Sequence, residues 1–249
     1  MPNTAPQAGV RRALNQKQLL LFYQPIHDLR SREIVAGEAL LRARRRNGQI
    51  RSAVPIAHAA EEGSQMFRLD SWMMQRAFKD SAHWDGVRLN VNLSPREFEE
   101  GHLVQRLKKL GDVSRLNLEI TETSYIEHPK KLRSVTAKIR ALGAQLWLDD
   151  FGTGHSSLSH LLNLDVDGVK VPATFIKGIH ESERSRAITR SIIDLAHELE
   201  LKVIAEGVEN EKQLGCLGDL RCDYIQGFLF SEPMAAGEFT SVLSGSSTQ

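Results

Sequence analysis

Residues 146–158 read LWLDDFGTGHSSL, and this stretch decides how the chain can fold. An apolar run ends in two adjacent carboxylates, Asp149 and Asp150, and a glycine-spaced, hydroxyl-rich loop follows. A short apolar run bounded in this way is typical of a buried strand. Two like charges so close together repel each other, and each is costly to remove from water. The pair therefore either lies in solvent or holds a cation.

Strand-like and helix-like segments alternate on both sides of this stretch. Apolar runs predict strands at 19–26, 33–41, 87–93, 116–122, 144–149, 168–171, 202–206 and 222–228. Helical periodicity predicts helices at 56–79, from Pro129 to a cap at Gly143, at 156–162, at 183–200 and at 210–218. In the 183–200 helix the apolar face comprises Ile188, Ile192, Leu195 and Leu199. Such alternation predicts right-handed crossovers and a parallel sheet covered by helices.

The first two strands are connected differently, because only a short polar gap, HDLRSR at 27–32, separates them. A gap of this length fits an antiparallel hairpin, whereas a parallel crossover needs about a dozen residues or more. Eight predicted strands in 249 residues indicate an α/β fold, a modified (β/α)8 TIM-like barrel with one antiparallel strand near the N-terminus. An open doubly wound sheet is the competing fold.

The composition, with 41% hydrophobic and 25% charged residues, is that of a soluble globular chain. The net charge is +1, so the total charge indicates no surface for a nucleic-acid polymer. The two cysteines, Cys216 and Cys222, are too few for a disulfide framework and predict a reducing cytoplasm. No apolar run approaches the roughly 18 residues of a membrane span, so no membrane insertion is expected. Residues 1–17 are predicted to be a flexible lead-in and residues 244–249 a polar tail.

Polar residues stand at or near the ends of the predicted strands, where an α/β barrel collects its chemistry. They are Glu38, Asn92, Glu119, Glu122, Asp149, Asp150, Lys170, Glu206, Glu209 and Gln226. Each one taken singly could be a solvated strand cap or part of a surface ion pair. Seven of the ten are acidic and only Lys170 is basic, so together they need further cations. Oxygen ligands without His or Cys among them favour Mg²⁺ or Mn²⁺ over zinc, and adjacent carboxylates can share two ions about 3.5–4 Å apart.

Six motifs in a fixed order carry a resemblance to a known family. GEALLR, NVNLS, LEITET, DDFGTGHSSLSHL, VIAEGVE and YIQGF together resemble the EAL domain family of bacterial cyclic di-GMP phosphodiesterases. The resemblance covers residues 18–243, which are expected to form the phosphodiesterase domain. It implies the modified barrel with one antiparallel strand, two Mg²⁺ or Mn²⁺ ions, and hydrolysis of cyclic di-GMP to linear pGpG. It also implies a homodimer.

The resemblance implies a role for each matching residue. Glu38, Asn92, Glu119 and Asp149 would hold the first metal, and Asp149, Asp150, Glu206 and Gln226 would serve the second. Lys170 would orient the attacking water, Glu206 would be the general base, and Asp150 would join them in catalysis and in substrate binding. Gln24, Leu40 and Arg42 would touch the nucleotide, where the planar fork of Arg42 suits a phosphate. Glu209 would support Glu206, and Glu122 would hold the DFGTGHSSL loop, which couples metal binding to dimerisation in the family.

One departure from the family pattern keeps a second function open. The family usually has an acid two residues after the lysine, whereas this chain reads Lys170-Val171-Pro172. The missing carboxylate bears on the second metal, so the alternative function is a weak or inactive domain that acts as a cyclic di-GMP receptor through a protein partner. A Schiff-base enzyme using Lys170 ranks last, because the surrounding acids would raise the pKa of that amine. The arginine run RARRR at 42–46 is expected to be a solvated loop near an anionic ligand.

Overall fold

The structure, a computed structural model, describes residues 10, 13–14, 18–45, 47–61, 65–95, 97, 102–121, 129–153 and 165–246. The predicted helix at 156–162 and the predicted residue Glu122 lie outside the described residues.

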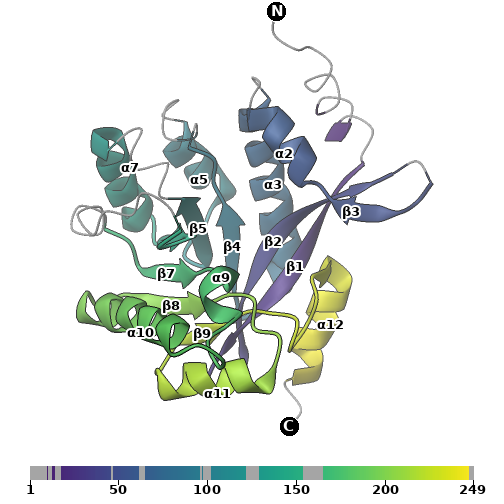
Figure 1. The fold of residues 1–249 in the computed structure, drawn as a ribbon. Helices are drawn as coiled ribbons and strands as arrows, with labels where there is room; N and C mark the ends of the chain where they lie inside the picture. The colour runs from purple at the N-terminus through teal and green to yellow at the C-terminus, as the bar shows by residue number, and fades with distance from the viewer. Residues whose placement is uncertain are drawn as a thin grey trace, which may run out of the picture.

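Eight strands of the described chain close into a barrel, which confirms the predicted fold and excludes the open sheet (Figure 1). They are β1 (Leu19–Asp28), β2 (Ile34–Arg44), β4 (Arg88–Asn92), β5 (Leu116–Thr121), β6 (Gln145–Asp149), β7 (Gly168–Val171), β8 (Lys202–Ala205) and β9 (Tyr224–Ile225). Strand β1 closes the ring by pairing with both β2 and β9, antiparallel in each case. The other neighbours in the ring pair in parallel, from β2–β4 round to β8–β9. As predicted, the short HDLRSR gap joins β1 and β2 in an antiparallel hairpin, because it leaves no room for a crossover.

Two short strands extend the sheet beyond the ring. Strand β3 (Ile50–Ser52) pairs antiparallel with the end of β2, and β10 (Met234–Ala235) pairs antiparallel with β1. Neither is predicted from the sequence, because strands of two or three residues have no periodicity to detect.

Helices surround the strands (Figure 1). They are α2 (Val54–Glu61), α3 (Met66–Asp80), α5 (Leu103–Leu110), α7 (Pro129–Ala141), α9 (Ala173–Ile176), α10 (Glu183–Glu198), α11 (Glu211–Asp219) and α12 (Ala236–Ser246), with a 3₁₀ turn η1 at Ser81–His83. The single helix predicted over 56–79 is two helices, α2 and α3. Helices α5, α9 and α12 are additional to the prediction. No helix in the described part of the chain combines the length and apolar character that crossing a bilayer requires.

The predicted apolar face of α10 is rotated from the face that packs. Its buried residues are Thr189, Ile193 and Ala196, whereas Ile188 is 38% exposed and Leu199, just beyond its end, is 36% exposed. Ile192 and Leu195, also on the predicted face, are partly buried and pack against the core. The prediction was wrong for Ile188 and Leu199, because two of the three buried positions carry a threonine and an alanine rather than large apolar side chains. The helical periodicity of a sequence is recognised from its large apolar side chains alone.

The hydrophobic core has two parts, separated by the wall of the barrel. The larger part includes alternate strand residues such as Leu118, Leu146 and Val203, and it packs with the helices. The smaller part contains Ile26, Ala36, Trp147 and Ile204. Trp147 and Ile204 alternate with residues of the larger part along their strands, so they point into the barrel. Here the Trp147 ring takes the space that a side chain at Gly168 would need.

Candidate metal and phosphodiester site

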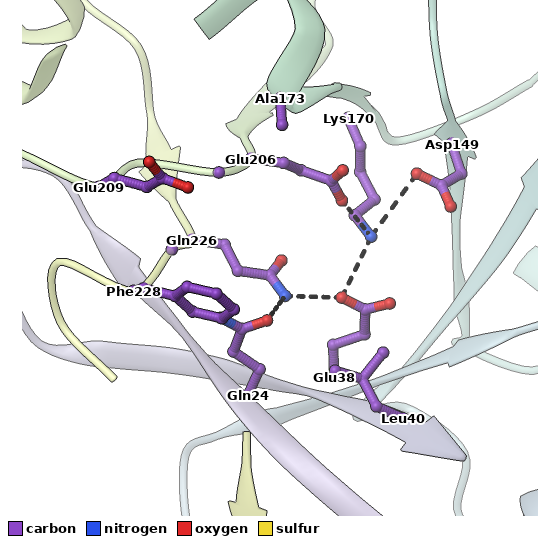
Figure 2. Close-up of a pocket in the computed structure, with 12 residues that line it drawn as sticks. Gln24, Glu38, Leu40, Asp149, Lys170, Ala173, Glu206, Glu209, Gln226 and Phe228 are labelled. Atoms are coloured by element: carbon purple, nitrogen blue, oxygen red, sulfur yellow. Dashed lines mark hydrogen bonds and ion pairs between the residues drawn. The ribbon is translucent and has the colours of Figure 1, made fainter. Parts of the chain in front are cut away.

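A cavity of about 330 Å³ opens among the carboxyl ends of the barrel strands and the loops that follow them (Figure 2). Its lining residues are Gln24, Glu38, Leu40, Asp149, Lys170, Ala173, Glu206, Gly207, Glu209, Gln226, Gly227 and Phe228. Eight of the twelve are site residues predicted from the sequence: Gln24, Glu38, Leu40, Asp149, Lys170, Glu206, Glu209 and Gln226. The parallel strands bring most of them together because their carboxyl ends meet at one end of the barrel. Gln24 joins them from the antiparallel strand β1, where it lies opposite Glu38.

The Lys170 ammonium lies at the centre of four carboxylates, which we call the carboxylate cluster: Glu38, Glu119, Asp149 and Glu206. The Nζ atom lies 2.7 Å from Glu206 Oε1 and 3.1 Å from Glu119 Oε1. It lies 3.4 Å from Glu38 Oε2 and 3.6 Å from Asp149 Oδ1. If all four acids are ionised, four negative charges against one positive charge leave a net charge of −3. The cluster therefore attracts additional cations.

Burial and mutual charge set the protonation of this cluster. Burial alone would lower the pKa of the Lys170 amine, but the four carboxylates raise that pKa well above its usual value. Burial raises the pKa of Glu206 to about 7, against the lowering effect of Lys170. Burial also raises the pKa of Glu119, with Lys170 again opposing the shift. Glu119 and Glu206 are thus protonated more readily than exposed carboxyl groups, because their negative charges are only partly compensated.

Amide side chains hold Glu38 from both sides. Asn92 Nδ2 donates to Glu38 Oε1 at 3.0 Å, and Gln226 Nε2 donates to Glu38 Oε2 at 2.6 Å. Gln226 Nε2 also donates to Gln24 Oε1 at 3.1 Å, and Gln24 Nε2 donates to the Ser231 carbonyl at 3.2 Å. The predicted residues Gln24, Asn92 and Gln226 thus form one hydrogen-bonded set with Glu38.

Two buried oxygens of the site have no hydrogen-bond partner among the described residues, Glu119 Oε2 and Gln226 Oε1. Leaving such atoms unpaired costs about 1–3 kcal/mol each, so their lone pairs are available to a ligand. Hard oxygen donors with excess negative charge suit Mg²⁺ or Mn²⁺, so the residues present fit a divalent cation. Within the described part of the chain, no three acidic, imidazole or thiolate side chains already surround one point at metal-holding distance. The carboxylates turn instead to the Lys170 ammonium.

Of the remaining predicted residues, Leu40 lines the cavity, whereas Arg42 and Asp150 do not. Leu40 lies two residues after Glu38 on β2 and therefore on the same face, and it lines the cavity. Arg42 follows on that face, where its Nη1 donates to the Leu41 carbonyl at 3.1 Å. Asp150 is exposed, has φ +55°, and does not line the cavity. Its backbone N–H donates to Asp149 Oδ1 at 2.9 Å, so the two adjacent acids of the opening motif face different surroundings.

The loop that carries Glu206 and Glu209 is fixed by the start of α11. Asn210 caps this helix by accepting from the Gln213 N–H, and Gln213 Oε1 accepts from the Glu209 N–H at 2.7 Å. The loop also pairs with the segment after β9, because Val208 N–H donates to the Gln226 carbonyl at 3.1 Å. A side chain at Gly227 would overlap the Val208 backbone, so only glycine permits this approach.

Four lining residues were missed by the sequence analysis, Ala173, Gly207, Gly227 and Phe228. Phe228 is 61% exposed at the rim of the cavity (Figure 2). A large exposed aromatic ring next to a polar cavity offers a stacking surface. The signal in the sequence was its place directly after YIQG. Pro172 has extended backbone angles, φ −69° and ψ 156°, and precedes α9, which begins at Ala173.

Comparisons with known proteins agree with this geometry. A family model described as EAL domain matches residues 7–233. The chain is 36% identical over 235 residues to the cyclic di-GMP phosphodiesterase NbdA of Pseudomonas aeruginosa, covering 90% of this chain and 30% of NbdA. It spans about a third of the length of the curated relatives it matches.

Solved structures give the same result. The PaMucR phosphodiesterase in a c-di-GMP complex superposes with a TM-score of 0.86 at 30% identity, covering 94% of this chain and 99% of that one. The Klebsiella pneumoniae protein BlrP1, in a manganese and cy-diGMP complex, superposes with a TM-score of 0.77 at 29% identity. That match covers 87% of this chain and 56% of BlrP1.

Proposed function

The chain belongs to the EAL domain family, and on that premise we propose that it hydrolyses cyclic di-GMP to linear pGpG with two divalent cations, Mg²⁺ or Mn²⁺. The observation that carries the proposal is the carboxylate cluster, which gathers acids from four different strands or strand ends around the Lys170 ammonium. The relative NbdA is named a cyclic di-GMP phosphodiesterase, and the BlrP1 complex contains manganese, which supports both the reaction and the cofactor.

Glu38, Asn92, Glu119 and Asp149 would hold one cation, and Asp149, Asp150, Glu206 and Gln226 would hold the other. Such ions supply Lewis-acid stabilisation of phosphoryl oxygens and a water that ionises more readily near neutral pH. The unpaired oxygens Glu119 Oε2 and Gln226 Oε1 are the donors that already lack a protein partner among the described residues. Asp150 would have to turn toward the cavity to take part.

Glu206 would accept a proton from the attacking water, and Lys170 would keep its own proton. In the protein without a bound cation, burial raises the pKa of Glu206 to about 7, the basicity of a competent proton acceptor near neutral pH. The Lys170 ammonium, 2.7 Å from Glu206 Oε1, remains charged and offsets negative charge as the phosphodiester enters. Glu209 lines the same cavity and would support Glu206 through the loop they share.

The rim of the cavity suits a guanine nucleotide. Leu40 and Phe228 offer apolar and aromatic surfaces to bases, and Gln24 offers an amide to polar edges. Arg42 lies on the same face of β2 as Leu40 and would donate to a phosphate. The substrate would therefore span from the metal site to this rim.

The test is a turnover assay on purified protein with saturating Mn²⁺ and product identification by chromatography. We expect cyclic di-GMP to be converted to pGpG, with loss of activity in EDTA and in Glu38→Gln and Asp149→Asn. Glu198→Gln, a change at an exposed residue of α10, is the matched control and should retain activity. Wild-type protein that binds Mn²⁺ but releases no pGpG would exclude the proposal.

Pro172 supports a second candidate, a receptor that binds cyclic di-GMP and signals through a protein partner without cutting it. The residue provides no carboxylate near the second metal and no backbone N–H. A receptor would bind the nucleotide with no turnover on the same preparation, and a gain of turnover in Pro172→Asp would assign the loss to this position. The homodimer, the cytoplasmic location and the domain boundaries stay predictions, the first of which light scattering would test.

A further inference from the structure

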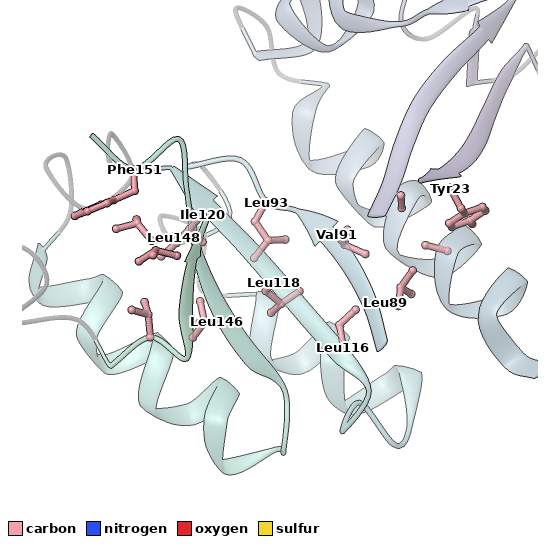
Figure 3. Packing of buried hydrophobic residues seen from close by; sticks show 14 of the residues in the cluster. Tyr23, Leu89, Val91, Leu93, Leu116, Leu118, Ile120, Leu146, Leu148 and Phe151 are labelled. Atoms are coloured by element: carbon pink, nitrogen blue, oxygen red, sulfur yellow. The ribbon is translucent and has the colours of Figure 1, made fainter. Parts of the chain in front are cut away.

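A row of polar side chains leads from the interior of the barrel to the carboxylate cluster. On β4 and β5 the residues Leu89, Val91, Leu116 and Leu118 belong to the large hydrophobic core (Figure 3). The residues between them therefore point into the barrel, because side chains alternate along a strand. They are Arg88 and Asn90 on β4 and Asn117 and Glu119 on β5, which we call the polar row. Asn90, Asn117 and Glu119 are at most 2% exposed.

The hydrogen bonds of the polar row form one continuous series. Arg88 Nε donates to Asn117 Oδ1 at 2.6 Å, and Asn117 Nδ2 donates to Asn90 Oδ1 at 2.9 Å. Asn90 Nδ2 then donates to Glu119 Oε1 at 2.7 Å. The parallel register makes the series possible, since Asn90 lies directly opposite Asn117 and Asn92 lies opposite Glu119.

The chemistry of the two ends fixes the direction of the series. A guanidinium can only donate, and a carboxylate that holds a cation can only accept, whereas an amide can turn either way. Arg88 therefore holds Asn117 with its oxygen toward the guanidinium, and Asn117 in turn holds Asn90 with its oxygen toward Asn117. This leaves the Asn90 NH₂ group with one orientation, toward Glu119.

The Glu119 carboxylate is thereby fixed with one oxygen engaged and the other open. Oε1 accepts from Asn90 and lies 3.1 Å from Lys170 Nζ, whereas Oε2 is buried without a partner among the described residues. We propose that Asn90, oriented by Asn117 and Arg88, is a positioning residue that presents Glu119 Oε2 to a divalent cation. This inference rests on the proposed function in taking Glu119 as a metal ligand.

A purely structural role would make a different prediction from a positioning role. If the row serves only to satisfy buried polar groups, any substitution that keeps volume and pairing should leave metal affinity unchanged. Asn117→Asp keeps the volume and the pairing with Arg88, and changes only the pairing with Asn90. The new carboxylate cannot donate to Asn90, so the Asn90 amide is expected to turn, placing its oxygen against the Glu119 carboxylate.

The experiment measures Mn²⁺ affinity by calorimetry in the absence of nucleotide, so that it does not depend on turnover. We expect Asn117→Asp and Asn90→Leu each to weaken Mn²⁺ binding by about 10- to 100-fold, the usual effect of losing a partner that orients a metal ligand. The control is Thr136→Val, which removes the hydrogen bond from another fully buried side chain, Thr136 Oγ1 to the Arg133 carbonyl, on α7. It should bind Mn²⁺ as the wild type does even if its melting temperature falls.

A double variant tests whether Asn117 acts through Asn90. In the Asn90→Leu background, Asn117→Asp should cause no further loss of Mn²⁺ affinity, because the group it orients is gone. Wild-type affinity in both single variants, or equal loss in Thr136→Val, would overturn the inference. Absence of Mn²⁺ binding by the wild type would overturn it together with the metal site. Mn²⁺ binding without release of pGpG would exclude only the proposed hydrolysis, and the affinities would still decide the role of Asn90.

Discussion

The replacement Lys170→Met should destabilise the metal-free protein strongly and make it unusually responsive to Mn²⁺. Lys170 is 1% exposed and is the cation that lies within 4 Å of all four members of the carboxylate cluster. Methionine nearly preserves the length and apolar stem of lysine, so the main loss is the charge. In the variant the negative charge of the cluster must be reduced by a divalent cation or by protonation of the acids.

The size of the effect follows from the geometry. At an effective dielectric constant of about 20, the contact at 2.7 Å with Glu206 alone represents roughly 6 kcal/mol of gross attraction. Desolvation of the buried ammonium offsets most of the gross attraction, and removing one partner of a buried ion pair typically costs a net 3–5 kcal/mol, an order-of-magnitude figure. For a chain of this size, a loss of that size lowers the melting temperature by about 6–20 °C.

The assay is thermal melting in EDTA and again with Mn²⁺ in excess. A cation at about 100 times its Kd adds about 2.7 kcal/mol of stability, and the shift should be larger in Lys170→Met than in the wild type, because no ammonium competes for the carboxylates. Lys202→Met is the matched control, since Lys202 Nζ lies 2.6 Å from Asp223 Oδ1 but its side chain is 57% exposed. Exposed pairs contribute about 0–1 kcal/mol, so this control should melt close to the wild type. If Lys170→Met in EDTA melts within about 2 °C of that control, a difference of about 1 kcal/mol or less, Lys170 is not the charge that holds the cluster together.

Three further predictions concern single residues. Burial raises the pKa of Asp70 to about 6 from 3.8, so its protonated form is favoured in the folded state and stability falls as pH rises from about 4 to 6. That loss is about 3 kcal/mol by order of magnitude. Urea titrations across this range should show that the free energy of unfolding depends less on pH in Asp70→Asn than in the wild type. The same pH dependence in both proteins would contradict the assignment. Gly227→Ala should lower the melting temperature, because the added methyl overlaps the Val208 backbone, and a variant as stable as the wild type would show that the two loops can separate at no cost. Phe228→Ala should leave the melting temperature unchanged, since the ring is 61% exposed, but weaken cyclic di-GMP binding, measured in EDTA where no turnover is expected, by about 10-fold through loss of stacking. Unchanged affinity would remove Phe228 from the binding site.

Local patterns in the sequence were enough to place most of the barrel. Each of the eight ring strands is an apolar run bounded by polar residues, and the short gap after β1 determined its antiparallel direction. The same runs identified the acids at strand ends, so Glu38, Asp149 and Glu206 could be expected at one end of the barrel before any coordinates. Short or weakly periodic elements escaped this reasoning, among them β3, β10 and α9.

Packing between distant segments decided what the patterns could not. The buried face of α10 contains Thr189 and Ala196, whereas the large apolar residue Ile188 is exposed. Which face is buried depends on how the helix packs against the rest of the fold, and the spacing of large apolar residues does not determine it. The exposed position of Asp150 depends on a single left-handed backbone angle directly after β6. Neither the composition nor the spacing of the DDFGTG motif distinguishes Asp150 from Asp149.

The chain by itself determined which side chains stand at the ends of the strands, because strand periodicity is a property of neighbouring residues. The tertiary structure alone decided that the Lys170 ammonium reaches four carboxylates and that Asn117 orients Asn90 toward Glu119. Both arrangements depend on the register between strands that lie tens of residues apart in the chain. That register is set by closure of the whole barrel, which no local stretch encodes.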